Sequence, residues 1–195
     1  MLGSKQPWRE TFRSLRGTST FRFFATAFVA YVVWSVAYEQ ALKPKTMLDE
    51  VVIGHMVSAT ECVMQALEWP VGTYPQAATH RNRVGVAGHV GVRIGAPCDG
   101  VALFALFTIF VLAFPGAVLR KLWFIPAGIA VLHAANILRV VLLVRIQVVA
   151  PEWLEFNHDY TFTVFVYGLV FALWHLWTVW GQTPAAKSRM KPIDK

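Results

Sequence analysis

The chain has 195 residues, of which 56% are hydrophobic and only 15% are charged, and its mean hydropathy is +0.48. A soluble domain of this size carries about a quarter charged residues, so the excess of apolar residues indicates a multi-pass membrane protein. The net charge of +7 does not indicate nucleic-acid binding, because the basic residues stand in clusters beside apolar runs, as the positive-inside rule describes.

The chain begins with a basic segment, residues 1–22, which holds five lysines or arginines and one acid. An apolar run follows to about residue 42 and is just long enough to cross a bilayer, which takes ~20 residues. A cleaved signal peptide is the alternative, but the run is bulky and has no clear small-x-small cleavage site. We therefore expect a first membrane span at about 23–42.

The region between this span and the next is more polar. Residues 47–69 place apolar side chains at helical spacing but also carry acidic residues and a histidine, a pattern typical of an amphipathic helix on or near the membrane surface. Pro70 and Gly72 end this helix. Apolar residues then alternate with glycine, histidine and arginine from Val84 to Ile94, which predicts a short strand or hairpin.

The remaining apolar runs predict three more spans, and the basic pair Arg120-Lys121 separates the first two of them. Tryptophans near the end of the last run are typical of an interfacial aromatic belt. The expected fold is all-α: a polytopic bundle of about four membrane helices, with an extracytoplasmic amphipathic helix and a short hairpin. One membrane-embedded domain, 23–180, lies between the basic segments 1–22 and 181–195, with spans at about 23–42, 101–119, 122–143 and 160–180.

The basic clusters fix the expected orientation in the cytoplasmic (inner) membrane. With the N-terminal segment inside, four spans also put Arg120-Lys121 and the basic tail inside. Three residues that are distant in the sequence then fall close to the outer surface: Cys98 before the second span, Arg139 near the outer end of the third, and His158 before the fourth. Topology alone therefore predicts that they converge on the extracytoplasmic side.

Each of these residues has a catalytic interpretation and a purely structural one. Cys98 stands at a helix N-terminus, where the helix dipole favours a thiolate, but an inert thiol or a disulfide with Cys62 is the alternative. Arg139 shares a helix face with Asn136 and has the donors to hold an oxyanion, or it reaches out to lipid headgroups. His158 suits a general base or acid, or it is an ordinary interfacial histidine.

The three motifs together resemble the exosortase/archaeosortase family. Its members have a Cys followed by a Gly at the start of one membrane helix, Asn-x-x-Arg in the next, and a third residue at the start of the following helix. Cys98-Asp99-Gly100, Asn136-Ile137-Leu138-Arg139 and His158 match this order, and a histidine in the third position is closer to the bacterial exosortases.

The resemblance implies a cysteine transpeptidase that cleaves C-terminal sorting signals, made of a short motif, a membrane helix and a basic tail. Cys98 would be the nucleophile, Arg139 the oxyanion stabiliser and His158 the general base and acid, with Asn136, Asp99 and Gly100 in support. The thioester would pass to a membrane lipid or an envelope glycan. Many relatives carry further upstream helices, which implies an oligomer or an accessory subunit here, and Asp99 replaces the small residue often found at its position.

Other functions remain open at this stage. Water as the acceptor would make the protein a simple protease with the same residues. A non-catalytic alternative is a membrane scaffold, or a protein that binds anionic lipid or glycan, with Cys62 and Cys98 in a disulfide. His55, His80 and His89 lack metal-ligand spacing, and no dinucleotide fingerprint occurs, so neither a metal nor a cofactor is expected.

Overall fold

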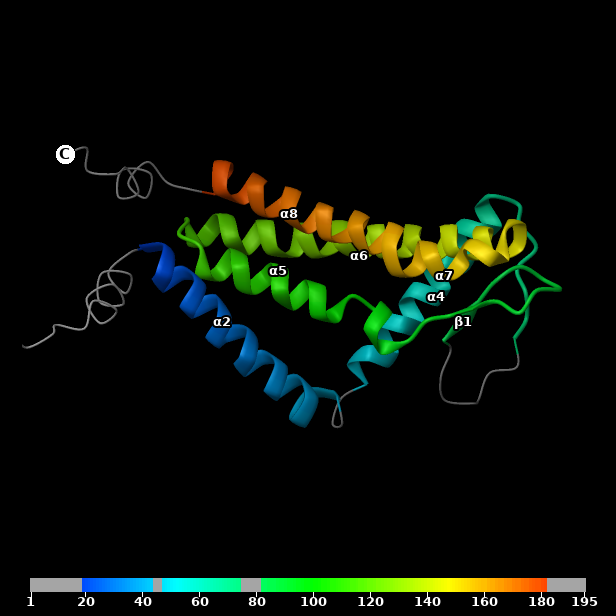
Figure 1. Cartoon of the computed structure of the whole chain (residues 1–195), viewed down its shortest axis with the longest axis horizontal. Helices are drawn as coiled ribbons and strands as arrows, with labels where there is room; N and C mark the ends of the chain where they lie inside the picture. Colours follow the sequence, from blue (N-terminus) through cyan, green and yellow to red (C-terminus); the bar gives the residue numbers. More distant parts are fainter. Residues whose placement is uncertain (1–18, 44–46, 75–81, 182–195) are drawn as a thin grey trace, which may run out of the picture.

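The computed structural model of the chain describes residues 19–43, 47–74 and 82–181. Most of the predicted N-terminal basic segment, almost all of the predicted tail and His80 lie outside these residues. The described part is almost entirely helical, as predicted (Figure 1). Its helices and strands are α2 (Ser19–Ala37), α4 (Leu48–Ala66), β1 (Arg83–Val84), β2 (Val92–Arg93), α5 (Val101–Ala113), α6 (Val118–Val149), α7 (Leu154–Phe156) and α8 (Phe162–Trp180).

Within the residues that the structure describes, three helical segments are long and apolar enough to cross a membrane: 21–42, 118–149 and 151–180. The chain therefore has the make-up of a membrane protein. The second predicted span, 101–119, is shorter than expected, because α5 ends at Ala113. Its 13 residues measure about 20 Å, whereas the hydrocarbon core is about 30 Å thick. The helix stops there because Phe114 is extended (ψ 139°), the conformation that the following Pro115 favours.

The third predicted span is longer than expected, because α6 runs for 32 residues from Val118. The basic pair therefore lies in the first turn of α6 and not before it. Arg120 donates a hydrogen bond from Nη1 to the carbonyl of Trp180 (2.6 Å), and Lys121 donates one from Nζ to the carbonyl of Leu112 (2.8 Å). Cations suit these positions, because the C-terminal ends of α8 and α5 carry partial negative charge.

Two buried clusters hold the helices together. At one end α5, α6 and α8 pack through Phe107, Leu132, Val170 and Trp177. The approach is close, because a Cβ added at Gly128 of α6 would lie 2.2 Å from the Phe107 ring. At the other end, α4 and the hairpin pack against the second half of α6 through Met56, Val57, Met64, Val84, Ile94, Val140 and Val144.

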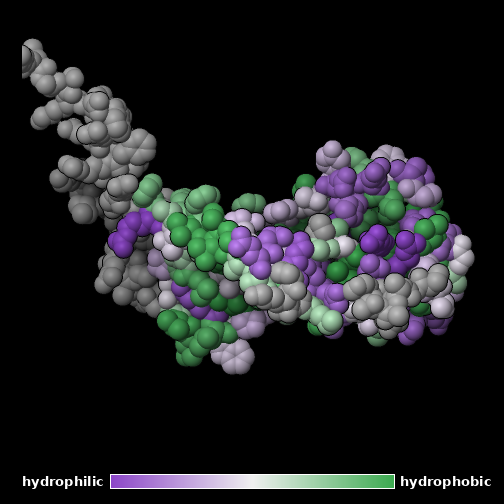
Figure 2. Space-filling model, turned by 90° about the horizontal axis from the view of Figure 1, so that it is seen from below, coloured by the Kyte–Doolittle hydropathy of each residue, from purple (hydrophilic) through white to green (hydrophobic). Residues whose placement is uncertain are grey.

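The predicted amphipathic helix and hairpin are both present. α4 buries one face against α6 and exposes the other. β1 and β2 form an antiparallel pair in which Val84 lies opposite Val92. Hydrophilic residues gather at the end of the molecule that holds the hairpin, and most hydrophobic surface lies at the end that holds α2 (Figure 2). This division matches a membrane-embedded bundle with a polar cap.

Candidate active site at Cys98

Cys98 ends a short 3-10 turn, Ala96–Cys98, just before α5. The chain then reverses at Gly100, whose φ of +89° is a left-handed conformation that residues with a side chain rarely adopt. A Cβ at this position would also lie 3.1 Å from the amide nitrogen of Asn136. The glycine two residues after the cysteine is therefore required by the backbone and by the close approach of α6.

Asp99, between these two residues, is buried and caps α5. Its Oδ1 accepts a hydrogen bond from the Val101 N–H at 2.8 Å, which satisfies one of the free donors at the start of the helix. Burial raises the pKa of Asp99 to about 6, and the negative charge of nearby Asp49 contributes to the increase. Asp99 thus holds the turn in place, at an electrostatic cost when it is ionised.

α6 contributes two side chains, three residues apart on one face. Asn136 is buried and donates a hydrogen bond from Nδ2 to the Cys98 carbonyl at 2.8 Å, which fixes the turn to α6. One turn further along, Arg139 directs Nη2 to the Cys98 sulfur at 3.9 Å. Its Nε is shielded from solvent and has no hydrogen-bond partner within the described residues. The guanidinium therefore has donors left for a ligand beside the thiol.

The helical segment 151–180 contributes the histidine. His158 Nε2 lies 3.1 Å from Cys98 Sγ, and its Nδ1 lies 2.8 Å from Oδ1 of Asp159. Both residues belong to a π-helical turn, Asn157–Thr161, at the start of α8. Such wide turns are frequent at functional sites. Cysteine, histidine and aspartate thus form a continuous hydrogen-bonded row.

A cleft of about 430 Å³ opens beside this row. Cys98, Arg139 and His158 line it together with side chains from α2, α5 and α8. Its apolar walls come from α5 and α8, and Tyr31 contributes from α2. These wall residues include Ala102, Leu103, Leu106, Val166 and Tyr167. The thiol is therefore accessible from a cleft that runs along the helices and not from a sealed core.

The structure brings together the three residues for which topology predicted convergence: Cys98, Arg139 and His158. His158 precedes α8, as expected, and the helical turns before α8 continue it back to residue 151. Asp159 had no predicted role, although a carboxylate directly after a candidate catalytic histidine was a usable signal. Both cysteines are free, with Cys62 exposed, so the structure lacks the disulfide of the non-catalytic alternative.

The comparisons with known proteins do not extend these observations. No protein-family model matches the chain, and neither a curated protein nor a solved structure matches it. A functional conclusion therefore depends on the residues of this chain and on their geometry.

Proposed function

We propose that the protein is a membrane-embedded cysteine peptidase or transpeptidase of the exosortase type. The observation that carries this proposal is the 3.1 Å contact between Cys98 Sγ and His158 Nε2, with Asp159 at the other ring nitrogen. A thiol, a base in hydrogen-bond reach and a group that orients the base are the parts that nucleophilic catalysis requires. The motifs that resemble exosortases contain two of these three residues.

The first half of the reaction follows from these positions. His158 Nε2 takes the thiol proton as Cys98 Sγ attacks a peptide carbonyl carbon. Arg139 donates hydrogen bonds to the oxyanion that develops on the carbonyl oxygen. The tetrahedral intermediate collapses when the imidazolium gives its proton to the leaving amine, and a thioester on Cys98 remains. Asp159 holds the imidazole in orientation and stabilises its charged form.

The cleft suggests which proteins would be cut. Its apolar walls come from α2, α5 and α8, and Cys98 packs against the cluster that joins α4 and the hairpin to α6. A substrate that is itself anchored by a membrane helix would present the adjacent peptide bond to Cys98. The C-terminal sorting signal of an exported protein has this form. We place the active site on the extracytoplasmic side of the inner membrane, where the positive-inside rule orients the chain.

The proposal is tested by acylation of the thiol. In a Cys62→Ser background, the purified protein in lipid nanodiscs is treated with p-nitrophenyl acetate, and intact mass reports acetylation. Cys98 should be acetylated rapidly in this protein and not in the Cys98→Ala variant. His158→Ala should lower the acylation rate by about 10²–10⁴-fold, as expected for loss of a general base. Equal rates with and without His158 would refute the proposal.

Transfer and simple hydrolysis share this first step and differ in the second. A membrane protein that carries a sorting signal would be incubated with the enzyme in its native membrane. The mass of the cleaved product would then separate the two outcomes. A product with a free carboxyl terminus shows that water is the acceptor. A product with added mass shows that the acceptor is an envelope lipid or glycan.

A further inference from the structure

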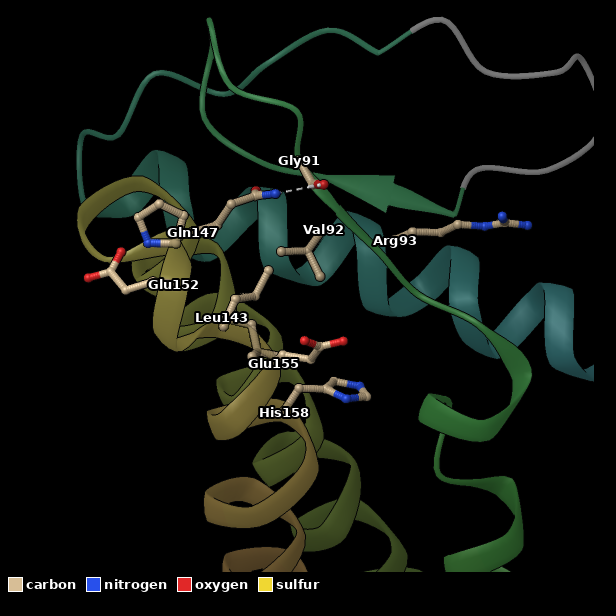
Figure 3. Close-up of a pocket in the computed structure, with 10 residues that line it drawn as sticks. Gly91, Val92, Arg93, Leu143, Gln147, Glu152, Glu155 and His158 are labelled. Carbon is tan, nitrogen blue, oxygen red and sulfur yellow. Dashed lines mark hydrogen bonds between the residues drawn. The ribbon is translucent and has the colours of Figure 1, made fainter.

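A second cavity, of about 510 Å³, shares one residue with the cleft at Cys98: His158 (Figure 3). Strand β2, the C-terminal end of α6 and the segment from Pro151 to His158 line it. β2 belongs to the hairpin, and the other lining residues lie where the two long helical segments 118–149 and 151–180 meet. The base therefore lies between a cleft bordered by α2, α5 and α8 and a cavity bordered by the hairpin.

The polar groups of this cavity are mainly hydrogen-bond acceptors. Glu152 and Glu155 line it. Glu155 lies beside His158, whereas the Glu152 carboxylate points away from the histidine (Figure 3). Arg93 is its one lysine or arginine and extends away from the histidine in the same view. Ionised carboxylates only accept hydrogen bonds, so the cavity offers negative charge next to the proposed base.

Gln147 adds an acceptor without a partner. Its Nε2 donates a hydrogen bond to the Gly91 carbonyl at 3.1 Å, which attaches the hairpin to α6. Its Oε1 is shielded from solvent and has no hydrogen-bond partner within the described part of the chain. A buried acceptor without a donor is unfavourable, so a ligand that brings N–H groups would satisfy it.

We propose that this cavity is the acceptor site and that it binds a primary amine in its ammonium form. The inference rests on the proposed function, because the amine would react with the thioester on Cys98. An ammonium group provides positive charge for Glu155, beside His158, and N–H donors for Gln147. A neutral hydroxyl provides a donor but no charge, so the cavity favours an amine over a sugar or diol.

The transfer step balances with the groups present. The ammonium ion loses one proton to solvent at the mouth of the cavity, and the neutral amine attacks the thioester carbonyl carbon. His158 Nε2 takes the second proton from the attacking nitrogen. The carbon–sulfur bond breaks, the Cys98 thiolate leaves, and an amide forms between the substrate acyl group and the amine. The imidazolium then returns its proton to the thiolate, which restores the starting enzyme.

The test isolates the second step. The Cys62→Ser protein in nanodiscs is acetylated with p-nitrophenyl acetate and freed of reagent by desalting. Ethanolamine or ethylene glycol is then added over a concentration series. Mass spectrometry measures the ratio of the transfer product to acetate. We expect the ratio to rise and saturate with ethanolamine, and to stay far lower with ethylene glycol, which has the same size but no charge.

Variants identify the site. Glu155→Gln should lower the ethanolamine-to-water ratio by about two- to fivefold, the range expected for an exposed ion pair. Glu68→Gln is the matched control, because this exposed carboxylate lines neither cavity, and it should leave the ratio unchanged.

The outcomes separate the two proposals. Failure to acetylate Cys98 at all would overturn the proposed function. If Cys98 is acetylated normally, either of two results would overturn the acceptor site alone. One is that ethylene glycol gives as much transfer product as ethanolamine, and the other is that Glu155→Gln leaves the ratio of transfer product to acetate at the wild-type value.

Discussion

Replacing Asp99 by asparagine should stabilise the protein at neutral pH and leave its stability almost unchanged near pH 4. Asp99 is 1% exposed, and its pKa is about 6 compared with an ordinary value of 3.8. The folded state therefore favours the neutral acid. Well below pH 4 the residue is protonated in both states, and the penalty for its charge is absent. The penalty grows as the pH rises from about 4 through 6 and is complete at about pH 7.

The size of the effect follows from the pKa difference. Two units correspond to about 3 kcal/mol at 1.36 kcal/mol for each unit. Asparagine keeps the oxygen that accepts the Val101 N–H, so the cap of α5 is retained and only the charge is lost. Asp99→Asn should therefore gain about 3 kcal/mol above pH 7. The charge of Asp49 helps to raise the pKa of Asp99. In Asp49→Asn, the pH range over which the ionisation of Asp99 lowers the stability of the protein should therefore move downwards.

The assay is reversible unfolding in mixed detergent and SDS micelles, followed by tryptophan fluorescence at pH 4.5, 6 and 7.5. The difference between variant and wild type cancels the other titrating groups. Glu68→Gln serves as an exposed control with no expected change. A gain that was the same at all three pH values, or a loss of stability at pH 7.5, would refute the electrostatic reasoning.

Substitutions at three positions test the geometry around the thiol. Gly100→Ala should destabilise the protein by about 1–3 kcal/mol, because Gly100 has a positive φ. Gly54→Ala is the control and should not destabilise the protein, because a Cβ at Gly54 meets nothing within 4 Å. Equal losses of stability in SDS unfolding would contradict this prediction. Asp159→Asn should slow acetylation of Cys98 by up to about fivefold, because the contact between Asp159 and His158 is exposed and Asp159 only orients the base. A rate as low as that of His158→Ala would disprove this ranking. Arg139→Ala should lower the acetylation rate by ~10²–10³-fold. Arg139→Lys should recover part of this rate, because lysine keeps the positive charge but lacks the paired donors of the guanidinium. An unchanged rate in Arg139→Ala would exclude a role of Arg139 at the oxyanion.

The helical fold was predictable because its signals are local. Each signal depends only on neighbouring residues: the length of the apolar runs, the helical spacing in 47–69 and the alternation in 84–94. The long apolar helices, the amphipathic helix and the hairpin that these signals predict are all present. The limits of the helices were less predictable. α6 includes the basic pair as its first turn, because Arg120 and Lys121 find carbonyl partners on α8 and α5, and such partners lie far away in the sequence.

The sequence by itself determined that Cys98, Arg139 and His158 lie at one end of a helical bundle, because the order of apolar runs and basic clusters fixes the depth of each residue. Depth does not specify distance or direction. Only the tertiary structure decided that the thiol meets Nε2 of His158, that Asp159 meets the other nitrogen, and that two cavities share this histidine. These contacts depend on the π-helical turn and on how α6 and α8 pack, and both arise from side chains that are distant in sequence.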